Sequence, residues 1–318
     1  MPPDLIIFRI KRSNHDVGPS LIPLGKVLPL LIFFLSLMFL TVTAQNISPT
    51  SSEIHLIYTG NISGALDDCG CDEVLAGGLT RISTIINEFR QREQNLLVVD
   101  GGDFLNSYST PRANRMVIRL LPHLGYDALN IGDQEFVETT DFWERIDKPI
   151  VNALSLVSAN ISWVGSPSLH PYVIKKLPGA RIAITGLVER AAFEFIQPRD
   201  IQLTPVNKAM KRIERVLTSS SDLQIVLFHG NWSGARQLVE HFPWIDVIVL
   251  SHSQKQRVES IKNTILVECG SEGEYIGHLQ MKKEVDGWSY TNEFIPVEKR
   301  IHADGELKKI VDKFYQGY

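Results

Sequence analysis

Short apolar segments alternate along most of the chain with segments of helical periodicity. Residues 54–58, 96–99, 128–131, 182–188, 223–228 and 245–250 are apolar and rich in β-branched side chains, as buried strands are. Between the first two segments, Leu79, Ile82, Ile86 and Phe89 recur at the spacing of one helix face. Strands that alternate with helices over most of a chain predict a layered α/β fold.

Further segments complete this prediction. Residues 150–157 and 264–268 are expected to be strands, 116–124, 206–217 and 306–314 helices, and 275–282 with 288–296 a hairpin around Asp286-Gly287. One more helix is expected between the strands at 223–228 and 245–250. There is no internal repeat and no low-complexity linker, so we expect a single domain over residues 45–318.

Composition excludes some classes of protein. The chain has 318 residues, of which 44% are hydrophobic, and a net charge of -4. This balance is neither basic enough for a nucleic-acid partner nor polar enough for a disordered chain.

The N-terminal part of the chain differs from the rest. Residues 27–40 are almost uninterruptedly apolar, follow Arg9, Lys11, Arg12 and Lys26, and precede the small residues Val42-Thr43-Ala44. We interpret residues 1–44 as a signal peptide for export to the periplasm or another extracytoplasmic space. The run is shorter than the roughly 20 residues of a membrane span. Extended through residues 41–43, it could instead remain as an uncleaved anchor, the one membrane contact that we expect.

Polar groups that can bind metals follow five of the predicted strands. They are Asn61 and Ser63, then Asp103, then Asp133, then His229, and finally His252 and Gln254. Because ligands of open α/β sheets bind beyond the carboxyl ends of the strands, these side chains are expected to converge on one site. The alternative is that they are ordinary polar loop residues.

The order of these groups resembles the metallophosphoesterase (calcineurin-like) superfamily and, more closely, its bacterial 5'-nucleotidase branch. That branch carries D-x-H-G, G-D, G-N-H-E, a lone H and G-H-x-H at successive strand ends. The resemblance covers most of residues 53–283, including GGLTR at 77–81, DGGDF at 100–104 and IDVIVLSHS at 245–253. It implies a four-layer α/β/β/α sandwich, a two-metal centre between the sheets and hydrolysis of phosphate esters. The second domain of the 5'-nucleotidases, expected after residue 300, has no counterpart in this sequence.

The sequence departs from the family at one of the two implied metal sites. The donors of the first metal become Asn61, Ser63, Asp103 and Gln254, mostly neutral and weak ligands, so that site is expected to be empty or to bind only weakly. The resemblance places the second metal on Asp103, Asp133, His229 and His252. Two carboxylates and two imidazoles suit one divalent transition metal, Zn, Mn or Fe.

The implied catalytic positions are Asp133 and Gln134. Gln134 stands where the family has a histidine that contacts the phosphoryl group or the leaving oxygen, and an amide has no proton to give. Reduced or altered activity is therefore expected. The neighbouring Glu135 is expected to be structural.

A second chemical feature is the pair Cys69 and Cys71 in the loop after the first predicted strand. A subgroup of exported bacterial relatives carries C-G-C, sometimes with selenocysteine, directly before G-G-L-x-R. The pair could form a strained disulfide acting as a redox switch, a structural clamp, or a soft metal site together with Cys269. Four acidic residues around the pair, Asp67, Asp68, Asp72 and Glu73, are expected to raise the thiol pKa values. If Cys269 does not take part in such a site, we interpret it as a small buried apolar residue.

Two functions follow from these patterns. The first is an exported metal-dependent hydrolase of phosphorylated small molecules. The second is a non-catalytic or redox-active binding module that keeps the fold and one metal and uses the Cys69-Gly70-Cys71 loop.

Overall fold

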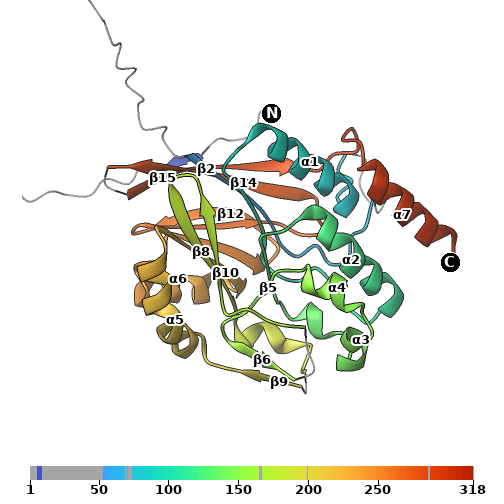
Figure 1. The fold of residues 1–318 in the computed structure, drawn as a ribbon, viewed down its shortest axis with the longest axis horizontal. Helices are drawn as coiled ribbons and strands as arrows, with labels where there is room; N and C mark the ends of the chain where they lie inside the picture. The colour runs from blue at the N-terminus through green and yellow to red at the C-terminus, as the bar shows by residue number, and fades with distance from the viewer. Residues whose placement is uncertain are drawn as a thin grey trace, which may run out of the picture.

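The structure is a computed structural model that describes residues 6–8, 53–68, 70, 74–164, 167–198, 200–285 and 287–317. Two β-sheets lie face to face, with strand orders β1-β15-β14-β2-β3-β4-β5 and β12-β13-β11-β10-β8-β7 (Figure 1). The predicted export segment at residues 27–40 lies outside the described residues. None of the described helices is long and apolar enough to cross a membrane.

The first sheet combines parallel and antiparallel strands. β2 (Glu53–Thr59), β3 (Leu96–Asp100), β4 (Ala128–Asn130) and β5 (Leu156–Val157) run parallel. On the other side of β2, the antiparallel hairpin of β14 (Tyr275–Glu284) and β15 (Gly287–Pro296) extends the sheet, and β1 (Ile6–Phe8) pairs with β15. The predicted hairpin is therefore present, although its turn residue Asp286 lies outside the described residues.

The second sheet has a parallel centre and antiparallel edges. Its central strands are β8 (Ala180–Val188), β10 (Leu223–Gly230), β11 (Val247–His252) and β13 (Thr264–Cys269). β7 (Val173–Leu177) and β12 (Gln256–Ile261) close its two edges. A separate two-stranded ribbon is formed by β6 (Ile161–Trp163) and β9 (Ile201–Leu203).

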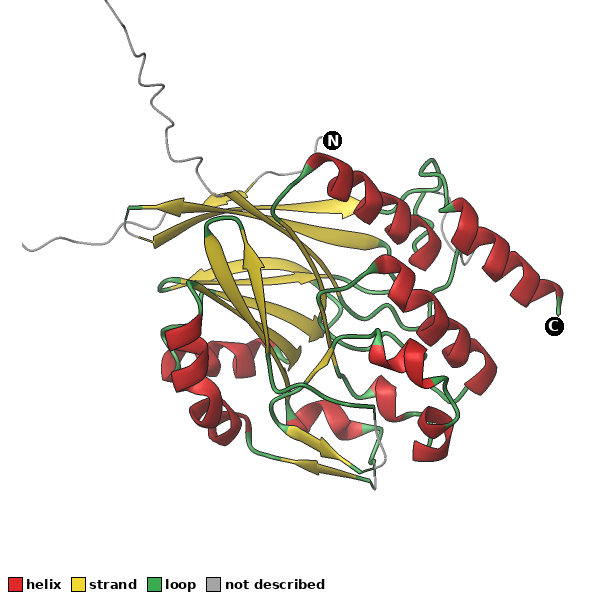
Figure 2. Ribbon diagram, viewed as in Figure 1, coloured by secondary structure: helices red, strands yellow, loops and turns green. Residues whose placement is uncertain are grey.

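Helices cover the outer faces of both sheets (Figure 2). The first sheet is covered by α1 (Leu79–Arg92), α2 (Pro111–Leu124), α3 (Thr140–Glu144), α4 (Lys148–Asn152) and α7 (Gly305–Gln316), and the second by α5 (Val206–Ser220) and α6 (Trp232–His241). The predicted four-layer α/β/β/α sandwich is thus confirmed.

Three hydrophobic cores correspond to the three interfaces between these layers. In β2, Leu56 and Tyr58 point into the core between the sheets, while Ile57 between them packs under the helices. Val226 and Leu227 of β10 divide in the same way between the helix-covered core and the inter-sheet core. Because both faces of these strands are buried, their sequences read as continuous apolar runs rather than as alternating patterns.

A buried asparagine joins the two sheets at their carboxyl ends. The side-chain amide of Asn130 donates to the carbonyls of Gly101 at 3.1 Å, Leu187 at 3.0 Å and Leu227 at 3.2 Å. A Cβ atom at Gly186 would lie 2.3 Å from Asn130 Oδ1, so only glycine fits opposite it. The end of β4 is thereby held against β8 and β10, which sets the spacing of the strand ends.

One predicted strand is wrong over most of its length. Residues 150–157 form the end of α4 and a connection before the short strand β5. Pro149 lies in the first turn of α4, where its fixed φ favours a helix and its missing N–H is not needed. Ile150 and Val151 pack against the outer core from this helix, so tertiary packing overrides their β propensity.

Two histidines form a contact inside the first sheet. His55 Nδ1 lies 3.1 Å from His278 Nε2, and His55 Nε2 lies 3.1 Å from Glu93 Oε2. His278 is 4% exposed and packs edge-on against Phe89. Burial, with the positive charges of His55 and Arg92, lowers the pKa of His278 to about 4.

This pKa predicts a loss of stability in acid. His278 is neutral in the folded protein down to about pH 4, whereas in the unfolded chain it takes up a proton below about pH 6.5. The contribution of His278 to the free energy of unfolding is therefore fully present above pH 6.5. It decreases by roughly 2–4 kcal/mol as the pH falls from 6.5 to 4. Urea unfolding at pH 7 and pH 4.5 should show that His278→Gln loses less free energy of unfolding than the wild type. The matched change at the exposed His123 should leave the loss unaltered; equal losses in all three proteins would contradict the prediction.

Candidate metal centre

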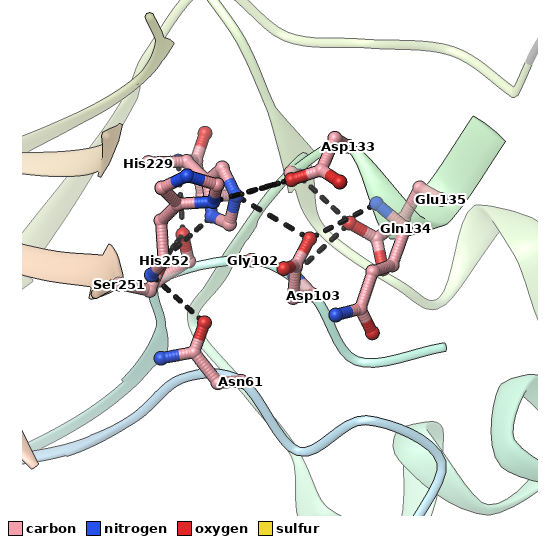
Figure 3. A network of polar contacts seen from close by, with 12 residues as sticks. Asn61, Gly102, Asp103, Asp133, Gln134, Glu135, His229, Ser251 and His252 are labelled. Carbon is pink, nitrogen blue, oxygen red and sulfur yellow. Dashed lines mark hydrogen bonds and ion pairs between the residues drawn. The ribbon is translucent and has the colours of Figure 1, made fainter. Parts of the chain in front are cut away.

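The structure brings together the four predicted donors of the retained metal site. Asp103 and Asp133 follow β3 and β4 of the first sheet, whereas His229 and His252 lie at the ends of β10 and β11 of the second. One ligand atom from each residue lies within 4.8 Å of every other (Figure 3). Residues separated by up to 149 positions in the chain thus meet in one cluster between the sheets.

The backbone around Asp103 is shaped to aim its carboxylate into this cluster. Asp103 has a left-handed φ of 63°, which is uncommon for a residue with a side chain. Its carboxylate accepts the N–H of Gln134 at 3.0 Å, and its own N–H donates to Glu135 at 3.1 Å. A Cβ at Gly132 would lie 2.2 Å from Asp103 Oδ1, so the glycine before Asp133 provides the necessary space.

The two histidines approach the carboxylates from the opposite sheet. His229 Nε2 lies 2.9 Å from Asp133 Oδ1 and 3.4 Å from Asp103 Oδ1, and His252 Nδ1 lies 3.4 Å from Asp133 Oδ1. His229 is fully buried, while the His252 side chain is 34% exposed. The cluster therefore has a closed side at His229 and an open side at His252.

The electrostatics of the cluster favour a bound cation. Burial, together with the charge of Asp133, raises the pKa of Asp103 well above its ordinary value. Burial also works to raise the pKa of Asp133, but its contacts with His229 and His252 outweigh burial and hold that pKa below its ordinary value. Two buried carboxylates this close repel each other unless positive charge lies between them. Two carboxylate oxygens and two imidazole nitrogens fit a divalent transition metal.

Asn61 and Ser63, predicted at the weakened first site, have structural partners instead. Asn61 is fully buried, its Nδ2 donates to Gly270 O at 3.0 Å, and its Oδ1 accepts the N–H of His252 at 2.8 Å. Ser63 Oγ donates to the carbonyl of Asn61 at 3.3 Å. Both polar ends of the Asn61 amide are thus engaged in holding the loop that carries His252.

Gln254 is the last predicted donor of the weak site, and the structure leaves it exposed, with a left-handed φ of 56°. Among the histidine, cysteine and acidic side chains that the structure describes, the cluster that could hold a metal consists of Asp103, Asp133, His229 and His252.

Glu135 is structural, as expected. Its carboxylate accepts the N–H groups of Gly132, Asp103, Phe104 and Leu105 at 2.7–3.1 Å. Burial and the nearby Asp103 raise its pKa to about 8. Glu135 therefore fastens the loop after β3 to the loop after β4, each of which carries one of the carboxylates.

Gln134 lies beside Asp103 with a free side-chain amide. It begins the short 3-10 helix η1 (Gln134–Phe136) and is 7% exposed. Its Oε1 is buried and has no hydrogen-bond partner. Buried polar atoms are normally paired, so this one marks a position where a further group completes the site.

Ser251 is a site residue that the sequence prediction missed. Its hydroxyl contacts His229 Nδ1 at 2.7 Å and the Gly101 carbonyl at 2.5 Å. The available signal was its place directly before His252, where the resembling G-H-x-H motif has glycine.

The base of the cysteine loop is held by ion pairs. Asp67 contacts Arg81 at 2.5 Å and Lys308 at 3.2 Å, and Asp68 lies 3.6 Å from Lys299. Two of the acidic residues expected to raise the thiol pKa values thus have basic partners, while Asp72 and Glu73 lie outside the described residues. Cys69 and Cys71 themselves lie outside the described residues.

The predicted interpretation of Cys269 as a small buried residue is confirmed. It is a free thiol, 3% exposed. Burial raises its pKa well above the ordinary value.

Comparisons with known proteins agree with this geometry. No family model matches the chain. The trifunctional nucleotide phosphoesterase protein YfkN of Bacillus subtilis is 20% identical over 309 residues, which cover 82% of this chain and 20% of that protein. The 5'-nucleotidase of Rattus norvegicus is 21% identical over 307 residues, which cover 83% of this chain and 52% of that protein.

The solved structures include the 5'-nucleotidase precursor from Thermus thermophilus. It has a TM-score of 0.71 at 19% identity, covering 83% of this chain and 59% of that chain. This chain accordingly spans only part of the length of its relatives.

The four-layer fold is that of the metallo-dependent phosphatases. In sequence and in structure, the chain is similar to calcineurin-like phosphoesterases and 5'-nucleotidases.

The cluster predicts one tightly bound metal per chain. Elemental analysis of the purified protein after dialysis should give one equivalent of Zn, Mn or Fe. His229→Ala should reduce it below a tenth of an equivalent, because that change removes the buried nitrogen donor. The exposed His241→Ala is the control and should retain one equivalent. Two equivalents in the wild type would contradict the interpretation of Asn61, Ser63 and Gln254.

The contacts of Asn61 predict that restoring an acid there does not restore a second metal. In Asn61→Asp, a carboxylate oxygen replaces the amide group that donates to Gly270 O, and two acceptors then face each other at about 3 Å. Thermal unfolding should show a loss of about 1–3 kcal/mol, with metal content unchanged at one equivalent. A gain to two equivalents would show that Asn61 is a displaced ligand rather than a structural clamp.

Proposed function

We propose that this protein is an exported, metal-dependent hydrolase of phosphate esters, related to 5'-nucleotidases, that works with one metal. The single observation that carries the proposal is the convergence of Asp103, Asp133, His229 and His252 within 4.8 Å. The relatives whose names specify nucleotide phosphoesterase or 5'-nucleotidase activity support a phosphorylated small molecule as substrate.

The proposed chemistry uses one metal as a Lewis acid toward a phosphoryl oxygen and as a group that lowers the pKa of a water molecule. Asp103, Asp133, His229 and His252 would hold it. The partly exposed His252 marks the side from which substrate enters. Gln134 would contribute a hydrogen bond to the substrate from its side-chain amide, without proton transfer.

Activity is proposed to be lower than in a two-metal enzyme. A second cation would neutralise charge on the transferring group, and the residues at its position do not provide the donors. Gln134 cannot protonate the leaving oxygen, so esters with good leaving groups should be hydrolysed fastest.

The second candidate function is a binding module that keeps one metal without turnover. The observation that favours it is the full engagement of Asn61, whose amide is committed to Gly270 and His252. In that case the Cys69-Gly70-Cys71 loop would be the working part, through redox exchange.

Export is part of the proposal. It rests on the apolar run at residues 27–40 and its basic leader, and on a structural neighbour described as a precursor. In spheroplasts, whose outer membrane has been opened, added protease should reach and degrade the mature protein if export occurs; a protein that is cut only after lysis of the cytoplasmic membrane would contradict export.

Phosphate-ester hydrolysis distinguishes the two functions. The metal-loaded protein should release nitrophenol from p-nitrophenyl phosphate or its bis-ester, and Asp133→Ala should lower the rate at least about 100-fold because it removes a charged metal ligand. Asp141→Ala, at an exposed carboxylate of α3, should retain the wild-type rate. Equal rates in wild type and Asp133→Ala would identify the activity as a contaminant. An inactive wild type that still binds metal would favour the binding module.

A further inference from the structure

We infer that Ser251 is a positioning residue that selects the tautomer of His229 and thereby makes Nε2 the atom that binds the metal. This inference rests on the proposed function only in that both need a metal at the same four donors. It concerns metal binding, not turnover.

The hydrogen bonds of Ser251 determine the direction of every proton in the chain of contacts from Gly101 to His229. The hydroxyl oxygen lies 2.5 Å from the Gly101 carbonyl, which can only accept, so the single hydroxyl proton must point there. Ser251 Oγ is then an acceptor toward His229 Nδ1 at 2.7 Å, and that nitrogen must carry a proton. A neutral His229 therefore has no proton on Nε2.

The unprotonated nitrogen faces two carboxylates. Nε2 of His229 lies 2.9 Å from Asp133 Oδ1 and 3.4 Å from Asp103 Oδ1. A nitrogen lone pair directed at two carboxylate oxygens is repulsive unless a second proton or a metal ion lies among them, and a metal ion bound by these carboxylates would take the place of that proton on Nε2. Ser251 thus acts through His229, without itself contacting the metal.

The surroundings of Ser251 are built to hold its side chain in place. It is fully buried at the end of β11. A Cβ at Gly60 would lie 2.9 Å from Ser251 Cβ, and one at Gly101 would lie 2.8 Å from it. Glycines at the ends of β2 and β3 in the first sheet therefore leave the room that this side chain occupies.

The test compares zinc affinity in the full-length protein by competition with a chelator. Ser251→Ala should bind zinc roughly 10–100-fold more weakly, as is common when the partner of a ligating histidine is removed. Ser251→Thr, which keeps the hydroxyl, should recover most of that loss. The matched control is Ser253→Ala. Ser253 also donates a short hydrogen bond, to Glu268 at 2.6 Å, but it does not contact His229. The zinc affinity of the Ser253→Ala protein should stay within about threefold of the wild type.

A spectroscopic measurement separates tautomer selection from a merely structural role. In zinc-loaded wild-type protein, nitrogen NMR of the histidine rings should show His229 coordinated through Nε2, with a slowly exchanging proton on Nδ1. In Ser251→Ala that proton should exchange faster. Coordination through Nδ1 in the wild type would overturn the proposal, and this result does not depend on whether any variant folds.

Two other outcomes also overturn it: a Ser251→Ala protein with wild-type zinc affinity, and a wild type that binds no zinc. If the zinc measurements come out as expected but the protein has no phosphatase activity, the proposed function is contradicted and the role of Ser251 is supported.

Discussion

The close approach of the two sheets at their carboxyl ends makes the metal centre possible. Each sheet supplies only half of the donor set, two carboxylates from one and two imidazoles from the other. Asn130 holds the ends together through three carbonyls, one from β3's end and two from the opposite sheet. A buried amide that donates to three carbonyls from both sheets leaves little freedom for the sheets to separate, because separation would leave the buried amide group of Asn130 without partners.

Glycines make this approach sterically feasible. At Gly132, Gly101 and Gly60, a side chain would collide with Asp103 or with Ser251. Around them, Glu135 ties the two carboxylate-bearing loops together and Asn61 ties the His252 loop to β13, so the donors are held by hydrogen bonds rather than by the metal alone.

The same network links the two positions at which the resemblance implies metals. Asn61, which the resemblance places at the first position, accepts the N–H of His252, a member of the four-residue cluster. Neutral side chains at Asn61 and Ser63 add nothing to the repulsion between the two buried carboxylates of that cluster. Gln134, a neutral amide beside Asp103, likewise adds no charge.

Local pattern in the sequence was sufficient for the layered α/β fold and for the gathering of polar side chains at one edge of the sheets, whereas the choice of the four donors came from the resemblance to metallophosphoesterases. Buried strands read as apolar runs, and the first polar residues after each run fall at the sheet's carboxyl edge. Local pattern gave the wrong result for residues 150–157, where it predicted a strand and the structure begins with the end of α4. There, Pro149 and packing against the outer core outweighed the β propensity of the side chains. Local pattern did not find Asn130 or Ser251 either, since both look like ordinary strand-end polar residues. Tertiary structure was needed to reveal which carbonyl, ring nitrogen or backbone N–H each of them meets, because those partners come from strands that are distant in sequence and adjacent only after the two sheets have packed.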